Sequence, residues 1–308
     1  MVLFMRIFLT GATGYVGTAV LDAIVRAGHE PLALVRTPET AERVATRGVR
    51  PVVGELAAPE SWVEVAATCE AIIHTAFEGT RQGVSLDRLT IDGLLDAARR
   101  RTEAGAATTL VYTSGIWVLG DTLELADETA PVNPPDLVAW RPSHEQLVLD
   151  AASSAVRAAV IRPGIVYGGA RGIVADLLKE GGNGLIRIIG TGTNHWPCVY
   201  DRDLADLYAR VVANPEAQGI YHATDEADER VEDIVEAIAE HSKTRADVRR
   251  VPIAEARTKL GPIADALVLD QRVRSPRART LGWEPTLHSI AGNVARLLEE
   301  FRDARAAA

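Results

Sequence analysis

Three glycines near the start of the chain form the first pattern whose spacing suggests chemistry. Gly11, Gly14 and Gly17 lie between an apolar run, Arg6–Thr10, and an amphipathic stretch, Tyr15–Ala27. Glycine lets a chain turn sharply off a strand and lets its backbone approach a pyrophosphate, whose charge meets the first turn of a helix. Because the pattern stands between a predicted strand and a predicted helix, we interpret it as a dinucleotide-binding turn rather than a purely structural one.

An arginine follows the second apolar run, and it bears on which dinucleotide would bind. Arg36 comes directly after Pro31–Val35, about 20 residues beyond Gly17, where an NAD site usually carries an acid for the ribose 2′-hydroxyl. An arginine there can pair with a 2′-phosphate and stack on adenine. We therefore predict NADP(H), the alternative being an ordinary surface arginine. Glu55, after the third apolar run, is a predicted neighbour of the adenine amino group.

The elements that must position these residues alternate along the first half of the chain. Predicted strands are Arg6–Thr10, Pro31–Val35, Val49–Val53, Ala71–Thr75, Thr109–Thr113 and Ala158–Arg162. Predicted helices between them are Tyr15–Ala27, Glu39–Thr46, Trp62–Thr68, Leu86–Arg101 and His144–Ser153. Strands alternating with helices predict an α/β fold with a parallel, doubly wound Rossmann sheet, and nearly all-apolar strands indicate burial on both faces.

The alternation of strand and helix patterns ends after Tyr167, where glycine-rich stretches alternate with short helical patterns. One strand-like run, Gly219–Ala223, is expected to return to the sheet, and the chain from about residue 226 has mostly helical patterns. We therefore predict an NADP-binding core over residues 1–168, joined by that strand, and a small, mainly substrate-binding lobe over residues 169–308.

Composition excludes several classes of protein. The 308 residues include 33 Lys and Arg against 42 Asp and Glu, a net charge of −9, which argues against a nucleic-acid partner or an anionic membrane surface. No apolar run approaches the roughly 18 residues of a membrane span, and no segment has the pattern of a signal peptide. Cys69 and Cys198 are too few for a disulfide framework, so a reducing cytoplasm is expected.

Several linked motifs now resemble one family across nearly the whole chain. They are Thr10–Gly17, Ala71–Ala76, Val111–Ser114, Arg162–Gly168, Asp203–Ala205 and Leu281–Pro285. In this order the chain resembles the extended short-chain dehydrogenase/reductases, the NAD-dependent epimerase/dehydratase family. The resemblance implies that Pro163, Gly164, Ile165 and Val166 border a nicotinamide. It also implies cofactor contacts from Thr10, Gly11, Thr13, Gly14, Tyr15, Val16, Gly17, Arg36, Glu55, Leu56, Thr75, Ala76, Phe77, Thr113 and His144.

The family's catalytic residues are only partly present. The resemblance implies a serine after the fifth strand, which Ser114 supplies, and a Tyr-x-x-x-Lys helix whose tyrosine transfers the proton. Here Trp140 stands at the tyrosine position and His144 at the lysine position. An indole N–H is not an acid or base at neutral pH, so the usual proton donor is absent.

Three interpretations of this altered site stay open. The first is an atypical reductase, in which Ser114 and the Trp140 indole orient a carbonyl and the proton comes from His144, from water or from the substrate. A histidine has an unperturbed pKa of about 6.5 and can act near neutrality, although His144 can equally contact only the cofactor ribose. The second is a non-catalytic NADP(H)-binding sensor or scaffold. The third is a nucleotide-sugar epimerase or dehydratase, which Arg36 and the missing tyrosine disfavour.

The resemblance also marks a substrate-facing segment rich in aromatic residues. Trp117, Asn194, His195, Trp196 and Tyr200 are predicted to contact the substrate, although both tryptophans would serve equally in ordinary packing. Aromatic walls with few charges suit a flat, apolar, polyketide-like carbonyl compound better than a sugar nucleotide. Histidine spacing predicts no metal site. Homodimers are a habit of the family, and neither substrate nor oligomeric state follows from the sequence.

Overall fold

The computed structural model describes residues 4–243 and 245–306, and the chain divides into two compact units. Unit 1 joins the stretch that ends at Ser114 to Trp140–Arg162 and Ala205–Tyr221. Unit 2 joins Gly115–Ala139, Pro163–Leu204 and the stretch that begins at His222. The predicted core over residues 1–168, joined by the strand near 219–223, remains a prediction, and the chain passes repeatedly between the two units.

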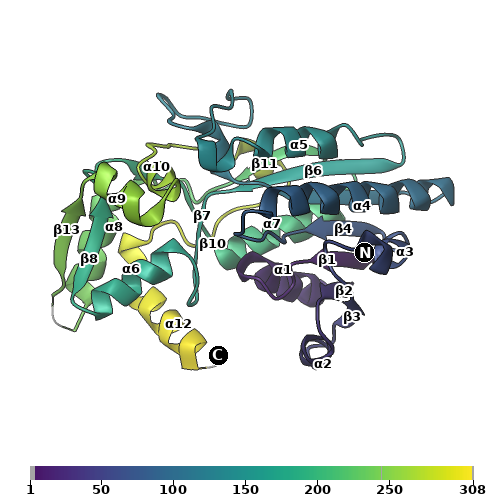
Figure 1. Cartoon of the computed structure of the whole chain (residues 1–308), viewed down its shortest axis with the longest axis horizontal. Coiled ribbons are helices and arrows are strands. Elements are labelled where there is room, and N and C mark those ends of the chain that lie inside the picture. Colours follow the sequence, from purple (N-terminus) through teal and green to yellow (C-terminus); the bar gives the residue numbers. More distant parts are fainter. Residues whose placement is uncertain (1–3, 244, 307–308) are drawn as a thin grey trace. The chain divides into compact units, whose positions relative to one another are not determined.

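A seven-stranded sheet forms the centre of unit 1, in the order β11-β6-β5-β4-β1-β2-β3 (Figure 1). Its strands are β1 (Arg6–Thr10), β2 (Glu30–Val35), β3 (Arg50–Val53), β4 (Ala71–His74), β5 (Thr108–Thr113), β6 (Val156–Pro163) and β11 (Gly219–Ala223). The five pairings from β3 to β6 are all parallel. All seven strands were predicted, and the doubly wound α/β fold is confirmed.

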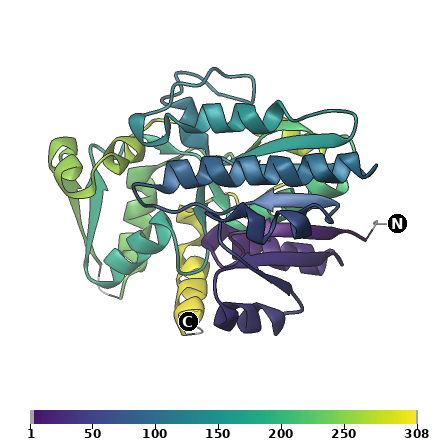
Figure 2. The same cartoon turned by 45° about the vertical axis from the view of Figure 1, so that its right-hand side comes forward.

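Helices connect these parallel strands. They are α1 (Tyr15–Arg26), α2 (Pro38–Ala45), α3 (Val63–Ala66), α4 (Gly83–Glu103), α5 (Arg141–Leu149) and α7 (Asp201–Ala213), with the short η1 (Pro59–Ser61). Helices α4 and α5 lie side by side against the sheet (Figure 2). Helix α5 begins three residues earlier than predicted, because Pro142 is tolerated in the first turn of a helix, where its missing N–H has no role.

Unit 2 combines short helices with three two-stranded pairs. The pairs are β7 (Ile165–Tyr167) with β10 (Cys198–Tyr200), β8 (Leu185–Ile189) with β13 (Asp247–Val251), and β9 (His195–Trp196) with β12 (Glu229–Arg230). The helices are α6 (Ile173–Gly182), α8 (Val231–His241), α9 (Ile253–Leu260), α10 (Ile263–Leu267), α11 (Pro276–Thr280) and α12 (Val294–Ala306), with η2 (Ile116–Leu119), η3 (Asp136–Val138) and η4 (Ala291–Asn293). The predicted helical character is found, whereas the β8–β13 pair was not predicted.

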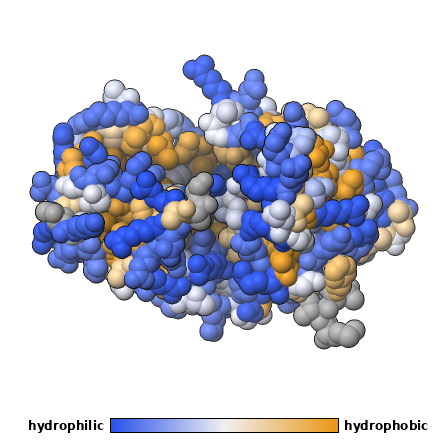
Figure 3. All heavy atoms as spheres, turned by 90° about the horizontal axis from the view of Figure 1, so that it is seen from below, coloured by the Kyte–Doolittle hydropathy of each residue, from blue (hydrophilic) through white to orange (hydrophobic). Residues whose placement is uncertain are grey.

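Apolar side chains gather inside each unit. In unit 1, Phe8, Ile72 and Leu110 are fully or almost fully buried, and in unit 2, Ile186 and Ile234 are fully buried. On the face that Figure 3 draws, hydrophilic residues predominate and apolar residues reach the surface in patches. Cys69 and Cys198 are both buried and unbridged. Among the described residues, no helix combines the length and apolar character needed to cross a membrane.

Candidate functional site

The predicted glycine turn lies between β1 and α1 and has a geometry that admits only glycine. Gly11 has a φ of +74°, in the left-handed region that glycine favours, and a Cβ there would approach Ala76 N to 2.6 Å. A Cβ at Gly17 would overlap the carbonyl oxygen of Gly11. The backbones of the turn, of α1 and of the segment after β4 therefore approach too closely for any larger residue.

The first turn of α1 can receive an anion. Gly14 is its N-cap and provides no capping side chain, and the first turn carries no acidic residue. The helix dipole and the N–H groups of a first helical turn favour negative charge at that end. Thr13 precedes this cap, and Tyr15 and Val16 begin the helix. The glycine geometry and the uncapped helix end together fit a dinucleotide pyrophosphate.

The residues predicted near the adenine lie at the ends of β2 and β3. Arg36 is 76% exposed, and its Nη1 lies 3.5 Å from Glu78 Oε1. An exposed pair of this kind contributes little, so the guanidinium can exchange it for another anion. Glu55 is exposed and accepts a hydrogen bond at its backbone oxygen from Trp62 Nε1, while Leu56 packs against the core of unit 1.

Threonine hydroxyls tie the carboxyl ends of three neighbouring strands together. Thr75 Oγ1 donates to the backbone oxygen of Thr10 at 2.7 Å, and Thr113 Oγ1 donates to the backbone oxygen of His74 at 2.7 Å. In a parallel sheet these ends share one edge, which is where α/β proteins bind ligands. Predicted cofactor residues of β1, β4 and β5 therefore converge on the edge that holds the glycine turn.

Ser114 follows β5 at the same edge and has an unused hydroxyl. Its backbone N–H donates to Ile161 O at 2.8 Å, which anchors the residue to β6. The side chain is buried, yet its Oγ has no hydrogen-bond partner in the described part of the chain. A buried polar atom without a partner is uncommon, because its desolvation is uncompensated. Such a hydroxyl is suited to donate to a bound carbonyl.

Trp140, at the tyrosine position of the family motif, belongs to an aromatic stack. Its ring stacks on Phe77 with centroids 5.2 Å apart and planes 11° apart. The Arg141 guanidinium lies 4.5 Å from the Trp140 centroid and 5.3 Å from that of Phe77, so cation–π attraction supports the stack. Phe77 is 45% exposed. The stack gives unit 1 a flat, partly exposed apolar surface beside α5.

His144 is held by a carboxylate that sequence reasoning did not identify. Its Nδ1 lies 2.7 Å from Asp87 Oδ2, and its ring meets that of Trp140 edge-on at 4.9 Å. Asp87 also contacts His74 and Tyr112, and all four side chains are buried. Asp87 could have been recognised from the sequence as a charged residue on the buried face of α4, because every other buried residue on that face is apolar, small or hydroxyl-bearing.

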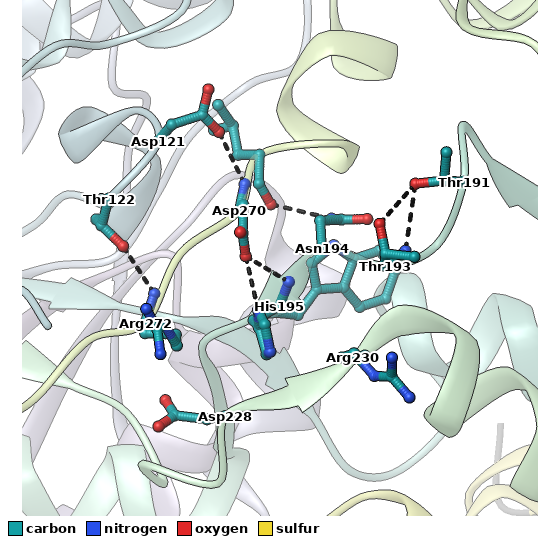
Figure 4. A network of polar contacts seen from close by, with 12 residues as sticks. Asp121, Thr122, Thr191, Thr193, Asn194, His195, Asp228, Arg230, Asp270 and Arg272 are labelled. Atoms are coloured by element: carbon teal, nitrogen blue, oxygen red, sulfur yellow. Dashed lines mark hydrogen bonds and ion pairs between the residues drawn. The ribbon is translucent and has the colours of Figure 1, made fainter. Parts of the chain in front are cut away.

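Three of the predicted substrate residues bind the segment 267–270, at the end of α10 in unit 2. Asn194 Nδ2 donates to the backbone oxygens of Leu267 and Leu269, and Trp196 Nε1 donates to that of Leu267. Asp270 accepts from the backbone N–H of His195 at 2.8 Å and contacts its ring at 2.7 Å (Figure 4). Asn194 and Asp270 also line a recess of about 380 Å³.

The remaining predicted residues of unit 2 have structural partners. Trp117 is half-buried and packs against apolar clusters. Tyr200 is buried, and its hydroxyl donates to Glu300 Oε1 at 2.7 Å, so this hydroxyl is already engaged. The residues predicted to border the nicotinamide lie at the end of β6 and in β7. Pro163 ends β6, and the backbone N–H of Gly164 donates to Ala223 O. Ile165 and Val166 belong to β7, which pairs with β10.

Comparison with known proteins identifies the family. The model of the NAD dependent epimerase/dehydratase family matches residues 7–224. The uncharacterized protein C2A9.02 of Schizosaccharomyces pombe is 31% identical over 301 residues, which cover 94% of this chain and 98% of the yeast protein. A 4-hydroxy-2-methyl-3-oxo-4-farnesyl-3,4-dihydroquinoline-1-oxide ketoreductase of Stigmatella aurantiaca is 31% identical over 174 residues, 53% of this chain and 51% of that enzyme.

A solved structure agrees with the fold. The crystal structure of human epimerase family protein SDR39U1 (isoform 2) with NADPH aligns with a TM-score of 0.75 at 20% identity, covering 96% of this chain and 99% of the human chain. At that identity the likeness concerns the fold alone. The family match, which spans most of the chain, carries the assignment. This chain is a member of the NAD-dependent epimerase/dehydratase family, whose enzymes use NAD(P) to act on alcohol and carbonyl groups.

Proposed function

We propose that this protein is an NADPH-dependent ketoreductase that reduces the carbonyl of an apolar or aromatic, polyketide-like metabolite without the usual catalytic tyrosine. The observation that carries the proposal is the buried Ser114 hydroxyl, which lacks a partner among the described residues at the sheet edge where the glycine turn lies. A carbonyl oxygen would supply the missing acceptor. The tryptophan at position 140 makes the oxidation of a sugar, which needs a competent base, a poorer match.

Arg36 supports NADPH as the cofactor. Its exposed guanidinium stands where an acid would hold the ribose of NAD, and only the half-buried carboxylate of Glu78 lies within ion-pair distance of it in the described structure. A 2′-phosphate would offer a stronger, doubly charged partner. The human relative of the same fold was solved with NADPH, which agrees with this choice of cofactor.

In the proposed mechanism the chain orients the carbonyl and supplies a proton. Bound NADPH supplies the hydride. Ser114 donates a hydrogen bond to the carbonyl oxygen and so favours the negative charge that develops there. His144 stands at the position of the family lysine and is the proposed source of the proton.

The stack of Phe77, Trp140 and Arg141 supports a flat and apolar substrate. Its aromatic surface lies next to His144, since the Trp140 and His144 rings are in edge-to-face contact. Flat aromatic ligands gain both apolar burial and ring contacts on such a surface. A ketoreductase of a quinoline oxide among the relatives fits the same class of substrate. Trp117, Asn194, His195, Trp196 and Tyr200 remain proposed substrate contacts.

A panel of carbonyl compounds tests the proposal. NADPH oxidation at 340 nm would be followed with 2′-hydroxyacetophenone, with acetophenone and with a fused-ring aromatic ketone, and NAD-dependent conversion of UDP-glucose would be followed in parallel. We expect turnover of at least one aromatic ketone and no conversion of the sugar nucleotide. The Ser114→Ala variant should lose about 100-fold in kcat on the same ketone, as expected when one donor to a developing oxyanion is removed.

The other outcomes separate the alternatives. Conversion of UDP-glucose would overturn the ketoreductase proposal in favour of an epimerase or dehydratase. Micromolar binding of NADPH without turnover of any carbonyl would favour a sensor or scaffold. Full activity of the Ser114→Ala variant would show that the unpartnered hydroxyl does not orient the substrate.

A further inference from the structure

Asp87 is the centre of a buried polar cluster that joins α4, α5, β4 and β5. Its Oδ1 lies 3.2 Å from His74 Nε2, and its Oδ2 lies 2.9 Å from the Tyr112 hydroxyl and 2.7 Å from His144 Nδ1. Beyond this first ring of contacts, His74 Nδ1 lies 2.6 Å from Thr10 Oγ1 in β1. Each of these residues is at most 6% exposed, so water does not compete for the contacts.

The hydrogen-bond pattern defines which protons these groups carry. Burial by itself would raise the pKa of Asp87, but the hydrogen bonds from His74, His144 and Tyr112 together hold it below its usual value. An ionised carboxylate only accepts hydrogen bonds, so all three neighbours must donate to it. His144 therefore presents Nδ1–H to Asp87, and its Nε2 has no hydrogen-bond partner within the described residues.

The other charged groups near the Asp87–His144 pair are the ion pair of Glu145 with Arg162 and the guanidinium of Arg141. Glu145 follows His144 in α5, and both its oxygens bind the buried Arg162 guanidinium. Arg141, also in α5, is stacked on Trp140. Within the described cluster His74 and His144 are the groups that can take up a proton beside the Asp87 carboxylate. His74 has both ring nitrogens engaged, by Asp87 and Thr10, whereas His144 has one nitrogen left.

We propose that Asp87 is the positioning residue of the proton donor: it fixes the tautomer of His144 so that Nε2 delivers a proton to the substrate's carbonyl oxygen. This inference rests on the ketoreductase function proposed above. The hydride adds to the carbonyl carbon, the π pair moves onto oxygen, and that oxygen takes the proton from Nε2 of the imidazolium. The product is the alcohol, and His144 is left neutral with Nδ1–H still donated to Asp87, until solvent returns the proton.

The arrangement also explains how the site can work without the family's tyrosine and lysine. A lysine at position 144 would be a fixed cation, whereas a histidine can gain and lose a proton near neutrality. The Asp87 carboxylate accepts the Nδ1–H of the ring and prevents the ring from rotating, as carboxylates do for histidines in other acid–base pairs. The same side chain then occupies the lysine position and performs the tyrosine's task.

Kinetics of the Asp87→Asn variant test the proposal, with Asp92→Asn as matched control. Asp92 lies on the same helix in an exposed ion pair with Arg88, away from the buried cluster. On the aromatic ketone that the wild type reduces, we expect Asp87→Asn to lower kcat about 100-fold while KM and the NADPH dissociation constant change little. The activity of the Asp92→Asn variant should equal that of the wild type.

The pH profile and a double variant separate positioning from a structural role. The rate of reduction should fall as the pH rises, because the donor must be protonated. His144→Gln should abolish the fall, and adding Asp87→Asn to it should cause no further loss, since both changes remove one function. Losses that multiply in the double variant, or a weakened affinity for NADPH with unchanged kcat, would overturn the proposal in favour of a ribose contact.

A measurement without turnover tests the tautomer directly in the unmodified chain. Long-range ¹H–¹⁵N spectra of the ¹⁵N-histidine-labelled protein distinguish Nδ1–H from Nε2–H, and the His144→Gln variant identifies the signal of His144. We expect Nδ1–H at high pH in the wild type, and an Nε2–H tautomer would contradict the proposal even if Asp87→Asn fails to fold. If the expected tautomer is found but no carbonyl compound is reduced, the proposed ketoreductase function is wrong, whereas the hydrogen bond by which Asp87 fixes the tautomer of His144 is confirmed.

Discussion

Glu145 in α5 and Arg162 in β6 form a buried ion pair with two hydrogen bonds. Arg162 Nε donates to Glu145 Oε1 at 3.0 Å, and Nη2 donates to Oε2 at 2.5 Å. Both side chains are at most 4% exposed. Glu145 directly follows His144, so this pair attaches to the sheet the helix that carries His144 and that Trp140 caps. The position of the candidate proton donor therefore depends on two buried carboxylates, Glu145 and Asp87.

Breaking this pair should destabilise the fold strongly. In Glu145→Gln the guanidinium of Arg162 stays buried without a counter-charge, and we expect a loss of about 3–5 kcal/mol in the free energy of unfolding. Glu103→Gln is the matched control, because its partner Arg99 is exposed on α4 and water replaces the lost contact. Urea unfolding followed by tryptophan fluorescence measures both variants. Equal midpoints for the two would contradict the importance of the buried pair.

Much of the fold could be predicted because its sheet is built from short apolar runs separated by helical patterns. β1, β2 and β4 are buried on both faces, and all seven strands of the sheet were recognised. In unit 2 the β8–β13 pair was not predicted, because β13 (Asp247–Val251) contains two arginines and an aspartate and has one buried residue. Its strand conformation comes from pairing with a partner about 60 residues away, which local periodicity does not record.

The candidate site could be predicted where a local motif defines it. A few neighbouring residues were enough to identify the glycine turn, Ser114 and the pair of Trp140 and His144 as candidates. Asp87 could not be placed in the same way, because it meets His144 only through the packing of α4 on α5. Its signal was present as a carboxylate on the buried stripe of α4, beside Thr90 and Ile91. A charge on an apolar helix face indicates a buried partner, but it does not say which one.

The glycine turn leads to a prediction about cofactor binding. A methyl group at position 17 would overlap the Gly11 carbonyl, so Gly17→Ala must displace the turn from α1. We expect the variant to bind NADPH at least about 100-fold more weakly, because the backbone can no longer approach the pyrophosphate. Gly182→Ala, where a Cβ meets nothing within 4 Å, should bind like the wild type. Fluorescence titration with NADPH measures both, and unchanged affinity in Gly17→Ala would exclude this turn as the phosphate site.

Arg36 leads to a prediction about the choice between NADPH and NADH. Arg36→Ala should weaken NADPH binding by about tenfold or more and leave NADH binding unchanged, since only NADPH carries the 2′-phosphate. Glu78→Gln should not weaken NADPH, because it removes the carboxylate that competes for the guanidinium. Arg26→Ala, a change of another exposed arginine in unit 1, serves as the control. Tighter binding of NADH than of NADPH by the wild type would overturn the NADPH assignment.

Asp225 in unit 2 leads to a prediction about stability and pH. Burial raises its pKa from 3.8 to about 7, with a further contribution from the nearby Glu229 carboxylate, and its Oδ2 has no partner among the described residues. The folded chain therefore keeps this proton in a range where the unfolded chain has lost it. Between pH 5 and pH 8 this residue should lower the free energy of unfolding by about 3 kcal/mol.

The Asp225→Asn variant should remove that part of the pH dependence. Because asparagine stays neutral at every pH, the variant should be more stable than the wild type at pH 8 and differ from it less at pH 5. Asp247→Asn, an exposed change in the same unit, should keep the slope of the wild type. Urea unfolding at both pH values measures the difference. If the Asp225→Asn variant and the wild type lose the same stability between pH 5 and pH 8, Asp225 is already ionised in the folded protein.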